Sequence, residues 1–274
     1  MCRCSLVGVF LLLFISSLAS ATGSDKQMDL ETSVCGIKEP ILFWLWSHAA
    51  GSADSKRIAG LDGLDDIAFT SKDGRILRGY RLRSRLHPVH GYLLVLQGNA
   101  ILADQLIGEF IPYARAGYDV YMYDYRGYGR SQGRRRLQAM VSDVQQLLAA
   151  LNAKPYERSL VYAFSFGGIL LLDGYTATTK INRLVIDSSP SRLSAYGCPV
   201  LYDPITHLPA DCRTFLFISG QHDNVVTPVM SKDMLDLAEQ RGARVVRDEQ
   251  FAHPFMDPAN HDRRMRLIEA FFLK

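Results

Sequence analysis

Residues Ser159 to Leu172 have the sequence SLVYAFSFGGILLL, and this stretch decides the fold of the chain. The part before Ser165 is apolar and β-prone, so it predicts a strand, and the part after it predicts the start of an apolar helix. Small residues at Ala163 and Gly167 let a strand and a helix meet closely at a sharp turn. Ser165 is therefore expected at the edge of a sheet, where reactive side chains gather.

Short apolar runs alternate with helical patterns on both sides of this stretch, after a hairpin that turns at an Asp-Gly pair. The predicted strands lie at Asp66–Thr70, Arg75–Arg83, 91–98, 118–125, 159–164, 181–190, 214–220 and 243–249, and the predicted helices at Leu102–Ala116, Gln138–Asn152, Phe166–Ala177, Pro228–Gln240 and His261–Phe272. Continuous apolar strands separated by helices predict an α/β fold, with a mostly parallel central sheet and helices on both faces.

The composition is that of one ordinary globular domain. The chain has 274 residues, of which 48% are hydrophobic and 22% charged, and no repeat or long linker interrupts it. This excludes disordered and fibrous proteins. The formal net charge is only +3, so no nucleic-acid partner is predicted.

Residues 1–21 predict a signal peptide, with Arg3 before a 13-residue apolar run, Leu6–Leu18, and an Ala-Ser-Ala cleavage signature. Export to the periplasm or the medium follows, and a membrane anchor that stays uncleaved is the alternative. The apolar run is short for a membrane span, which needs roughly 20 residues. Beyond it we expect an extension packed on the domain at 22–64 and the main domain at 65–274.

Two segments of the sequence could contact lipid. The segment ILFWLW, Ile41 to Trp46, favours a helix packed on the domain over a membrane contact, because six residues reach little way into a bilayer. Arg134 to Arg136 favour a solvated face, although they could attract an anionic substrate or headgroup. Peripheral membrane contact therefore remains an open prediction, and the sequence does not predict an oligomeric state.

Removal of the signal peptide would leave three cysteines, Cys35, Cys198 and Cys212, in a compartment that permits disulfides. The pair Cys198 and Cys212 brackets a short proline-rich segment, so that bridge is favoured, and pairing of either one with Cys35 stays open. No spacing of cysteines and histidines suggests a metal site.

Two serines compete for the role of nucleophile. The stretch GRSQG, Gly129 to Gly133, contains a literal GxSxG around Ser131. It lies several residues beyond its strand, in a glycine-rich loop. Ser165 directly follows a strand and precedes a helix, which is the position a nucleophile needs. Ser165 is therefore the predicted nucleophile.

A serine hydroxyl needs a base and an acid that orients the base. Asp223 follows the strand at 214–220, and His253 follows the strand at 243–249, so both should lie at the same edge as Ser165. Taken singly, Asp223 could cap a helix and His253 could be an ordinary loop residue. The order serine, acid, histidine favours a catalytic triad, with Asp187 as the rival acid.

From about Asp66 onward, the chain resembles serine hydrolases of the α/β-hydrolase superfamily, particularly the abhydrolase-domain and Bem46-like branch. The resemblance is carried by QGNA (97–100), DYRGYGRSQG (124–133), AFSFG (163–167), GQHD (220–223) and HPFMD (253–257). Two positions depart from the family pattern: Gln97 replaces a histidine, and Ala163 replaces the first glycine of the nucleophile turn.

The resemblance implies hydrolysis of an acyl ester or thioester through an acyl-enzyme, with the backbone amides of Asn99 and Phe166 as oxyanion donors. It implies no cofactor and a small-molecule or lipid-like acyl substrate. The cap at 191–212 is short, which predicts an open site suited to short acyl esters. A peptidase on the same fold, or a hydrolase-fold binding protein without activity, remains the alternative.

Overall fold

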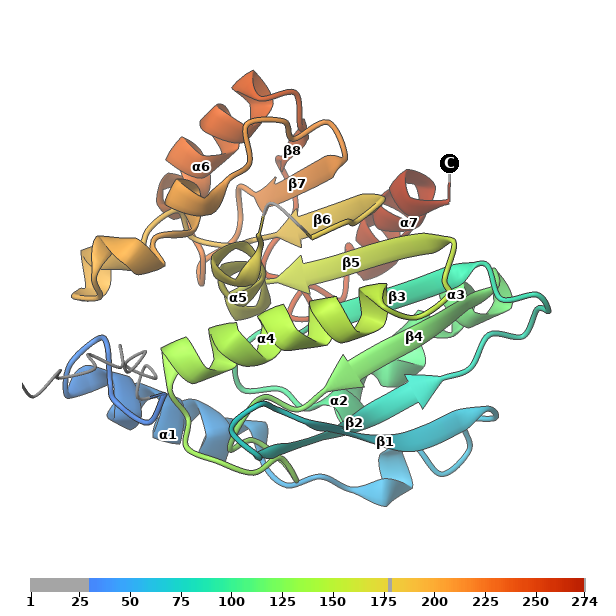
Figure 1. Cartoon of the computed structure of the whole chain (residues 1–274). Coiled ribbons are helices and arrows are strands. Elements are labelled where there is room, and N and C mark those ends of the chain that lie inside the picture. Colours follow the sequence, from blue (N-terminus) through green and yellow to red (C-terminus); the bar gives the residue numbers. More distant parts are fainter. Residues whose placement is uncertain (1–29, 177–178, 274) are drawn as a thin grey trace, which may run out of the picture.

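A computed structural model describes residues 30–176 and 179–273, and the predicted signal peptide lies outside them. Figure 1 shows one sheet of eight strands in the order β1-β2-β4-β3-β5-β6-β7-β8. The strands are β1 (Leu64–Thr70), β2 (Ile76–Leu82), β3 (Gly91–Leu96), β4 (Tyr118–Tyr123), β5 (Arg158–Phe164), β6 (Arg183–Asp187), β7 (Phe215–Gly220) and β8 (Arg244–Asp248).

The hairpin of β1 and β2 pairs antiparallel, and β2 joins β4 in the same sense. All other pairings, from β4 through β3 and β5 to β8, are parallel. Strands β3 and β7 are buried along their whole length, and β5 is buried after its first residue, because helices cover both faces of the sheet. The predicted α/β fold with a mostly parallel sheet is confirmed.

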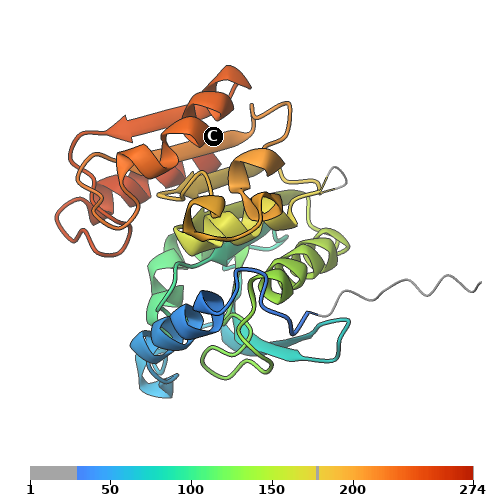
Figure 2. The same cartoon turned by 90° about the vertical axis from the view of Figure 1, so that its left-hand side faces the viewer.

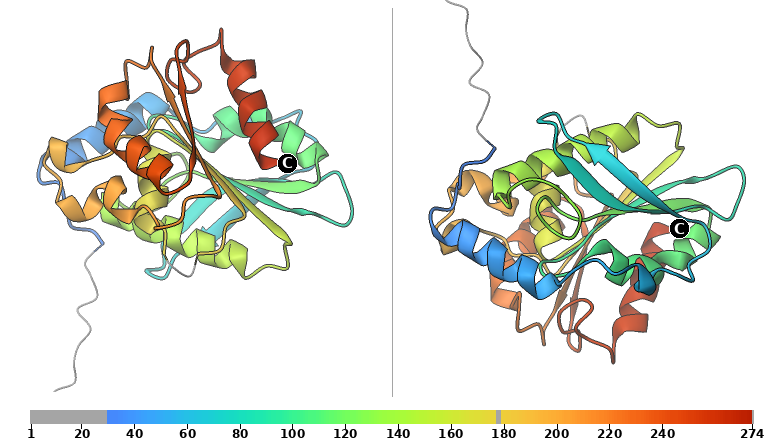
Figure 3. Two further views of the ribbon diagram at one scale, coloured as in Figure 1. Left: turned by 90° about the horizontal axis from the view of Figure 1, so that it is seen from above. Right: turned by 90° about the horizontal axis from the view of Figure 1, so that it is seen from below.

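Two helical layers enclose the sheet, as the edge-on views in Figure 3 show. The helices are α1 (Lys38–Ala50), α2 (Ala103–Leu106), α3 (Ile111–Arg115), α4 (Leu137–Asn152), α5 (Phe166–Gly174), α6 (Pro228–Gln240) and α7 (His261–Phe272), with 3-10 turns at Ser55–Arg57 and Ile107–Phe110. Side chains of α1, α4, α5 and α6 share one apolar core, and those of α2, α3 and α7 share the other. The sheet therefore separates two cores.

The helix expected at Leu102–Ala116 is broken into α2, a 3-10 turn and α3. Gly108 weakens a helix, and Pro112 has no N–H to donate to the preceding turn. In contrast, α6 and α7 have the bounds that the sequence predicts. The sequence pattern located those two helices well because neither is interrupted.

The carboxyl ends of β5, β6 and β7 point toward α1 and the segment that joins β6 to β7 (Figure 1). We call that segment, residues 191–212, the cap. It holds three 3-10 turns, Ser194–Tyr196, Val200–Tyr202 and Pro204–His207. Figure 2 shows α1 and the cap from the side of this edge.

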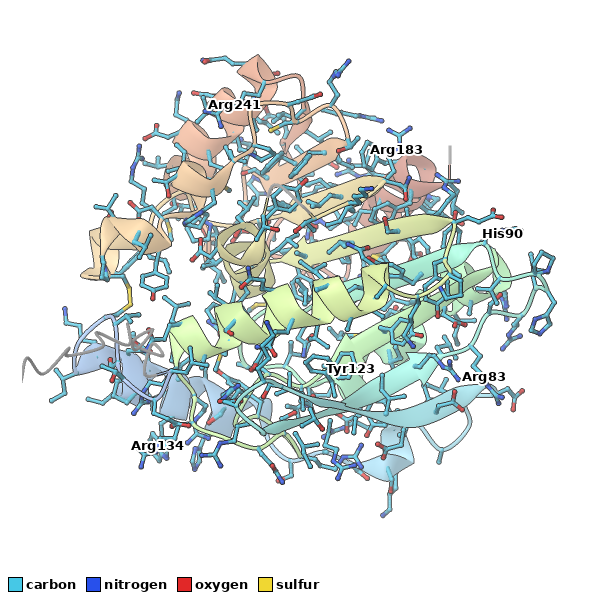
Figure 4. All side chains as sticks on the ribbon, viewed as in Figure 1. Arg83, His90, Tyr123, Arg134, Arg183 and Arg241 are labelled. Carbon is cyan, nitrogen blue, oxygen red and sulfur yellow. A yellow bond between two sulfur atoms is a disulfide. The ribbon has the colours of Figure 1, made fainter. Side chains whose placement is uncertain are left out.

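A disulfide joins Cys35, just before α1, to Cys198 of the cap, and its sulfur atoms are visible in Figure 4. The favoured Cys198–Cys212 bridge is therefore wrong. Cys212 is fully buried in the core below the cap, where its thiol donates to the carbonyl of Pro209. The segment between Cys198 and Cys212 runs from the surface to the core. The two cysteines are therefore close in sequence but do not pair.

Helix α1 contains the apolar segment that the sequence assigned to a packed helix. Phe43 lies with its ring centroid 5.4 Å from that of Phe166 at the start of α5, and Glu39 accepts a hydrogen bond from the amide of Leu137. Over the described parts of the chain, no helix combines the length and the apolar character needed to cross a bilayer.

Candidate active site

Ser165 sits on the turn between β5 and α5, with backbone angles of φ 53° and ψ −120°. A positive φ is strained for a residue with a side chain and persists only where the surroundings enforce it. Here the amide of Ser165 donates to the carbonyl of Asp187 at 2.8 Å. A side chain on Gly167 would begin 2.0 Å from the carbonyl oxygen of Leu96, so only glycine fits there.

His253 and Asp223 are in direct contact. Nδ1 of His253 donates to Oδ2 of Asp223 at 2.9 Å, and both side chains are buried. The other carboxylate oxygen of Asp223 accepts from the amides of Val225 and Val226. The carboxylate is therefore fixed on one side by the backbone and holds the imidazole on the other.

The environment of Asp223 keeps its carboxylate ionised. Burial raises the pKa of Asp223, but the hydrogen bond and charge of His253, together with the two backbone amides, outweigh burial and hold that pKa below its usual value. An ionised acid at this position stabilises an imidazolium, which is what a base requires after it has taken a proton.

All three predicted residues lie at the carboxyl edge of the sheet. Ser165 follows β5, Asp223 follows β7, and His253 follows β8. Among the described residues no hydrogen bond joins the hydroxyl of Ser165 to the imidazole, so this last contact stays a prediction. Catalytic hydrogen bonds are often long without substrate and tighten when it binds.

Asp187, the rival acid, is engaged elsewhere. Its carboxylate accepts from the hydroxyls of Tyr162 and Ser188 and lies 3.6 Å from Nε of Arg264. Burial raises the pKa of Asp187, against the opposing effect of Arg264. Arg264 also donates to the carbonyl of Ala252, so Asp187 contributes to holding the loop that carries His253.

The two expected oxyanion donors lie next to Ser165. Asn99 follows Gly98, where an added side chain would begin 3.3 Å from Cβ of Ser165. The amide of Asn99 has no acceptor among the described residues, and Phe166 is the first residue of α5, where an amide has no intrahelical partner. These amides can therefore donate hydrogen bonds to an oxygen on which negative charge develops.

Gln97 stands where the family pattern has a histidine, and two hydrogen bonds hold it in place. Its side-chain amide donates to the carbonyl of Tyr123, and its own carbonyl accepts from the hydroxyl of Tyr125 at 2.6 Å. These bonds tie the turn after β3 to the turn after β4. The histidine of the family pattern is therefore replaced by a residue that anchors the same turn.

A largely apolar cavity of about 530 Å³ opens beside Ser165. Its apolar lining comes from α1 (Leu42, Phe43, Trp46), from α4 and α5 (Leu137, Phe166, Ile169), and from the cap and the α6 region (Leu193, Tyr196, Val225, Val226, Met230). Ligand cavities of about 300–1,000 Å³ accept small molecules. The disulfide between Cys35 and Cys198 forms part of the wall.

Sequence reasoning missed the contribution of α1 to this cavity. The short cap led us to expect an open site, but α1 supplies a second wall. The available signal was the composition of ILFWLW, which is apolar on every side of a helix and therefore predicts more than one packing surface.

Ser131, in the literal GxSxG, has a structural role. Its hydroxyl donates to the carbonyl of Asp124 at 2.7 Å and accepts from the amide of Arg78 at 2.8 Å. These bonds fasten the glycine-rich loop to β2, so the hydroxyl is occupied. Within residues 30–176 and 179–273 no group of three or more metal-binding side chains occurs.

Comparison with known sequences identifies partial matches. Residues 103–202 match the family model described as serine aminopeptidase, S33. An uncharacterised protein of Escherichia coli K12, YfhR, is 26% identical over 135 residues, which are 46% of this chain and 47% of that protein. The chain thus spans about half the length of this curated relative.

Several solved structures share the fold at low identity. An esterase of Pyrococcus furiosus, Pf2001, superposes with a TM-score of 0.63 at 16% identity, over 82% of this chain and 98% of that one. An alpha-beta hydrolase of Vibrio vulnificus gives 0.66 at 16% identity, over 87% and 95%. An esterase of Exiguobacterium antarcticum gives 0.61 at 13% identity, over 77% and 100%.

Proposed function

We propose that this chain is a serine hydrolase of the α/β-hydrolase superfamily, and that it cleaves an acyl ester or thioester with Ser165 as nucleophile. The observation that carries the proposal is the hydrogen bond from His253 to Asp223 at the sheet edge where Ser165 lies. A buried, acid-oriented imidazole at the same sheet edge as a serine on a strained turn supports activation of that hydroxyl.

In the proposed mechanism, Oγ of Ser165 attacks the carbonyl carbon of the substrate while its proton passes to Nε2 of His253. The carbonyl electron pair moves to oxygen, where the amides of Asn99 and Phe166 donate to it. The tetrahedral intermediate expels an alkoxide or thiolate, which takes the proton from His253. Water then attacks the acyl-serine while His253 takes a proton from it, and the second tetrahedral intermediate breaks its bond to Oγ of Ser165. That oxygen takes the proton back from His253, and the acid is released.

The cavity beside Ser165 supports an acyl group as the part of the substrate that is bound. Its walls are apolar, with Phe43, Trp46 and Ile169 among them. Burial of each apolar methylene is worth about 0.8 kcal/mol, so such a cavity favours a hydrocarbon chain over a charged residue. The finer assignment to the ester-hydrolase class, rather than to peptidases, is part of the proposal.

Peptidase activity is the second candidate, because the matched family model carries the description of a serine aminopeptidase. The same nucleophile and base could cleave an amide, since a fold and a triad do not dictate the leaving group. A binding protein without activity is the third. Hydrolysis of p-nitrophenyl esters compared with aminoacyl anilides separates the first two, and absence of both supports the third.

The first test is covalent labelling with a fluorophosphonate probe. We expect wild-type protein to be labelled, Ser165→Ala to lose labelling completely, and Ser131→Ala to keep it, because Ser131 belongs to the other serine motif and serves the loop. Labelling of the Ser165→Ala variant would assign the nucleophile to another residue. An unlabelled wild-type protein that is folded by circular dichroism would contradict the whole proposal.

We also infer that the protein is exported. The disulfide between Cys35 and Cys198 supports a compartment that is oxidising, as the periplasm and the extracellular medium are. Fractionation of expressing cells, with the bridge detected by a mobility shift on reduction, tests this. Recovery of the protein only in the cytosolic fraction, with reduced thiols, would contradict it.

A further inference from the structure

Helix α1 presents large apolar side chains to solvent along one side. Ile37, directly before the helix, and four residues within it are 40% to 80% exposed: Ile41, Leu42, Trp44 and Leu45. At 100° per residue these five positions fall within one sector of the helix, opposite the buried Phe43. Exposed apolar patches of this kind are typical of surfaces that bind a partner or a membrane.

One border of this sector lies against three consecutive arginines. A groove on that side is lined by Ile41 and Trp44 of α1 and by Arg134, Arg135 and Arg136. Figure 4 shows Arg134 beside α1. Its side chain is 71% exposed, although its Nε lies 3.6 Å from the carboxylate of Glu31. Basic residues that flank an apolar helical face are typical of helices that lie on anionic bilayers.

The other border of the sector is the mouth of the cavity beside Ser165. Lys38 and Leu42 line that cavity, and across its mouth stand Tyr196 of the cap and Val225, each about half exposed. The exposed apolar surface is therefore continuous from α1 to the entrance of the cavity. A hydrocarbon chain could move from a bilayer into the cavity with little exposure to water.

From this continuity we propose that the solvent-facing side of α1 and the arginines 134–136 form a docking surface for an anionic lipid bilayer. The surface combines apolar side chains, a tryptophan and basic groups, which suits the boundary between headgroups and acyl chains. A protein partner would require a complementary shape and matching polar groups. The arginines instead carry positive charge, which favours a planar anionic layer. Docking itself does not depend on the proposed hydrolase activity.

The chain carries its own reporter of this contact. Its two tryptophans, Trp44 and Trp46, are both on α1. Trp44 is exposed, and Trp46 lines the cavity. Replacement Trp46→Phe leaves Trp44 as the single tryptophan. In the full chain with Ser165→Ala, to prevent lipid hydrolysis, we expect vesicles of phosphatidylcholine and phosphatidylglycerol (3:1) to shift its emission to shorter wavelength. Brominated lipids should quench it.

Sedimentation with the same vesicles measures the partition coefficient. Ile41→Asn with Leu45→Asn should lower it at least tenfold, and Arg134→Gln should lower it about fivefold, the effect of one basic residue near an anionic surface.

The matched controls lie at the opposite end of the sheet. Leu86→Asn removes an exposed apolar side chain, and Arg83→Gln removes an arginine that, like Arg134, lies 3.6 Å from one carboxylate. Neither control should change the partition coefficient.

Three results would overturn the proposal. Binding that survives both α1 substitutions would assign it to another part of the chain, such as residues 1–29. Absence of vesicle binding would remove the lipid partner, and a change of molecular mass in solution on substitution of Ile41 and Leu45 would indicate a second copy instead. Failure of the hydrolase proposal is detected separately, as absence of wild-type turnover of p-nitrophenyl acetate without vesicles. That turnover should not change in the Ile41→Asn and Leu45→Asn variant.

Discussion

Asp223 and Asp187 are buried carboxylates at the ends of neighbouring strands: Asp223 follows β7, and Asp187 is the last residue of β6. Asp223 holds the imidazole of His253 directly, whereas Asp187 pairs with Arg264, which in turn holds the loop that carries His253. The two acids thus have separable effects. Asp223 orients the base, and Asp187 stabilises the position of the loop.

Substitution of each acid by its amide separates these roles. Asp223→Asn should lower kcat for a p-nitrophenyl ester by about 10⁴, because the imidazole would lose its orienting acceptor. Asp187→Asn should lower the free energy of unfolding by about 3 kcal/mol, because it leaves the buried Arg264 without its counter-charge. Steady-state kinetics and urea unfolding measure the two quantities.

The contrast between the two variants decides the assignment. Should Asp187→Asn abolish turnover in a protein of unchanged stability while Asp223→Asn stays active, Asp187 would be the acid of the triad. The sequence places both acids at strand ends and therefore cannot choose between them by position alone. The choice depends on which carboxylate faces His253, and that is a property of side-chain packing.

At the scale of single elements, α5 carries an acid that burial keeps protonated. Neither carboxylate oxygen of Asp173 has a hydrogen-bond partner among the described residues. Burial, together with Asp203, raises the pKa of Asp173 to about 8. His207 of the cap comes within 3.8 Å of it. The native state therefore holds a proton at neutral pH that the unfolded chain releases.

This proton makes the free energy of unfolding of the protein depend on pH. Because the folded pKa of Asp173 lies above the unfolded one, its favourable contribution is complete below about pH 4 and is lost as the pH rises to about 8. Asp173→Asn should leave stability unchanged near pH 4 and raise it, relative to wild type, by at least about 1 kcal/mol near pH 8. Urea unfolding at both pH values measures the difference.

The control for this prediction is Asp211→Asn. Asp211 is exposed, and its hydrogen bond with Arg213 lowers its pKa to about 2, so it does not titrate between pH 4 and 8. A loss of stability at pH 8 in the Asp173→Asn variant would mean that the carboxylate is ionised and paired with His207, contrary to the prediction.

Local sequence patterns determine most helices and strands of this chain, whereas contacts between distant segments depend on the folded path. Strands buried on both faces and uninterrupted helices such as α6 and α7 were predicted with little error, because their periodicity is local. The role of α1 in the cavity wall was missed, since its apolar residues surround the helix and define no single face. Which cysteines pair likewise depends on the path of the chain in space.

For the molecule as a whole, the disulfide matters because it links parts of the chain that are far apart. Cys35 and Cys198 are separated by 163 positions, and the bridge fastens α1 to the cap across the cavity. A cross-link that closes a long loop stabilises the folded state by about 2–4 kcal/mol, chiefly by restricting the unfolded chain. The covalent closure therefore supports both the fold and the shape of the site.

Loss of this bridge should be visible in stability and in substrate preference. Cys35→Ser with Cys198→Ser should lower the free energy of unfolding by about 2–4 kcal/mol and raise KM for long-chain esters more than for acetate, because one wall of the cavity is released. Chemical unfolding and an ester chain-length series measure both effects.

Sensitivity to reductant provides the control for this prediction. The variant Cys212→Ala should remain as sensitive to reductant as the wild type, since that thiol is free and buried. Wild-type stability that does not change on reduction would contradict the stabilising role of the bridge.

The same bridge imposes an order on biosynthesis. The ribosome releases α1 long before it has added the cysteine, 163 positions later, that fastens this helix in place. The bridge that holds this wall of the cavity can thus form only after the cap has been made. Before then, Cys35 could form a disulfide with a different thiol. In such a chain the sheet would still assemble, but α1 would not be linked to the cap.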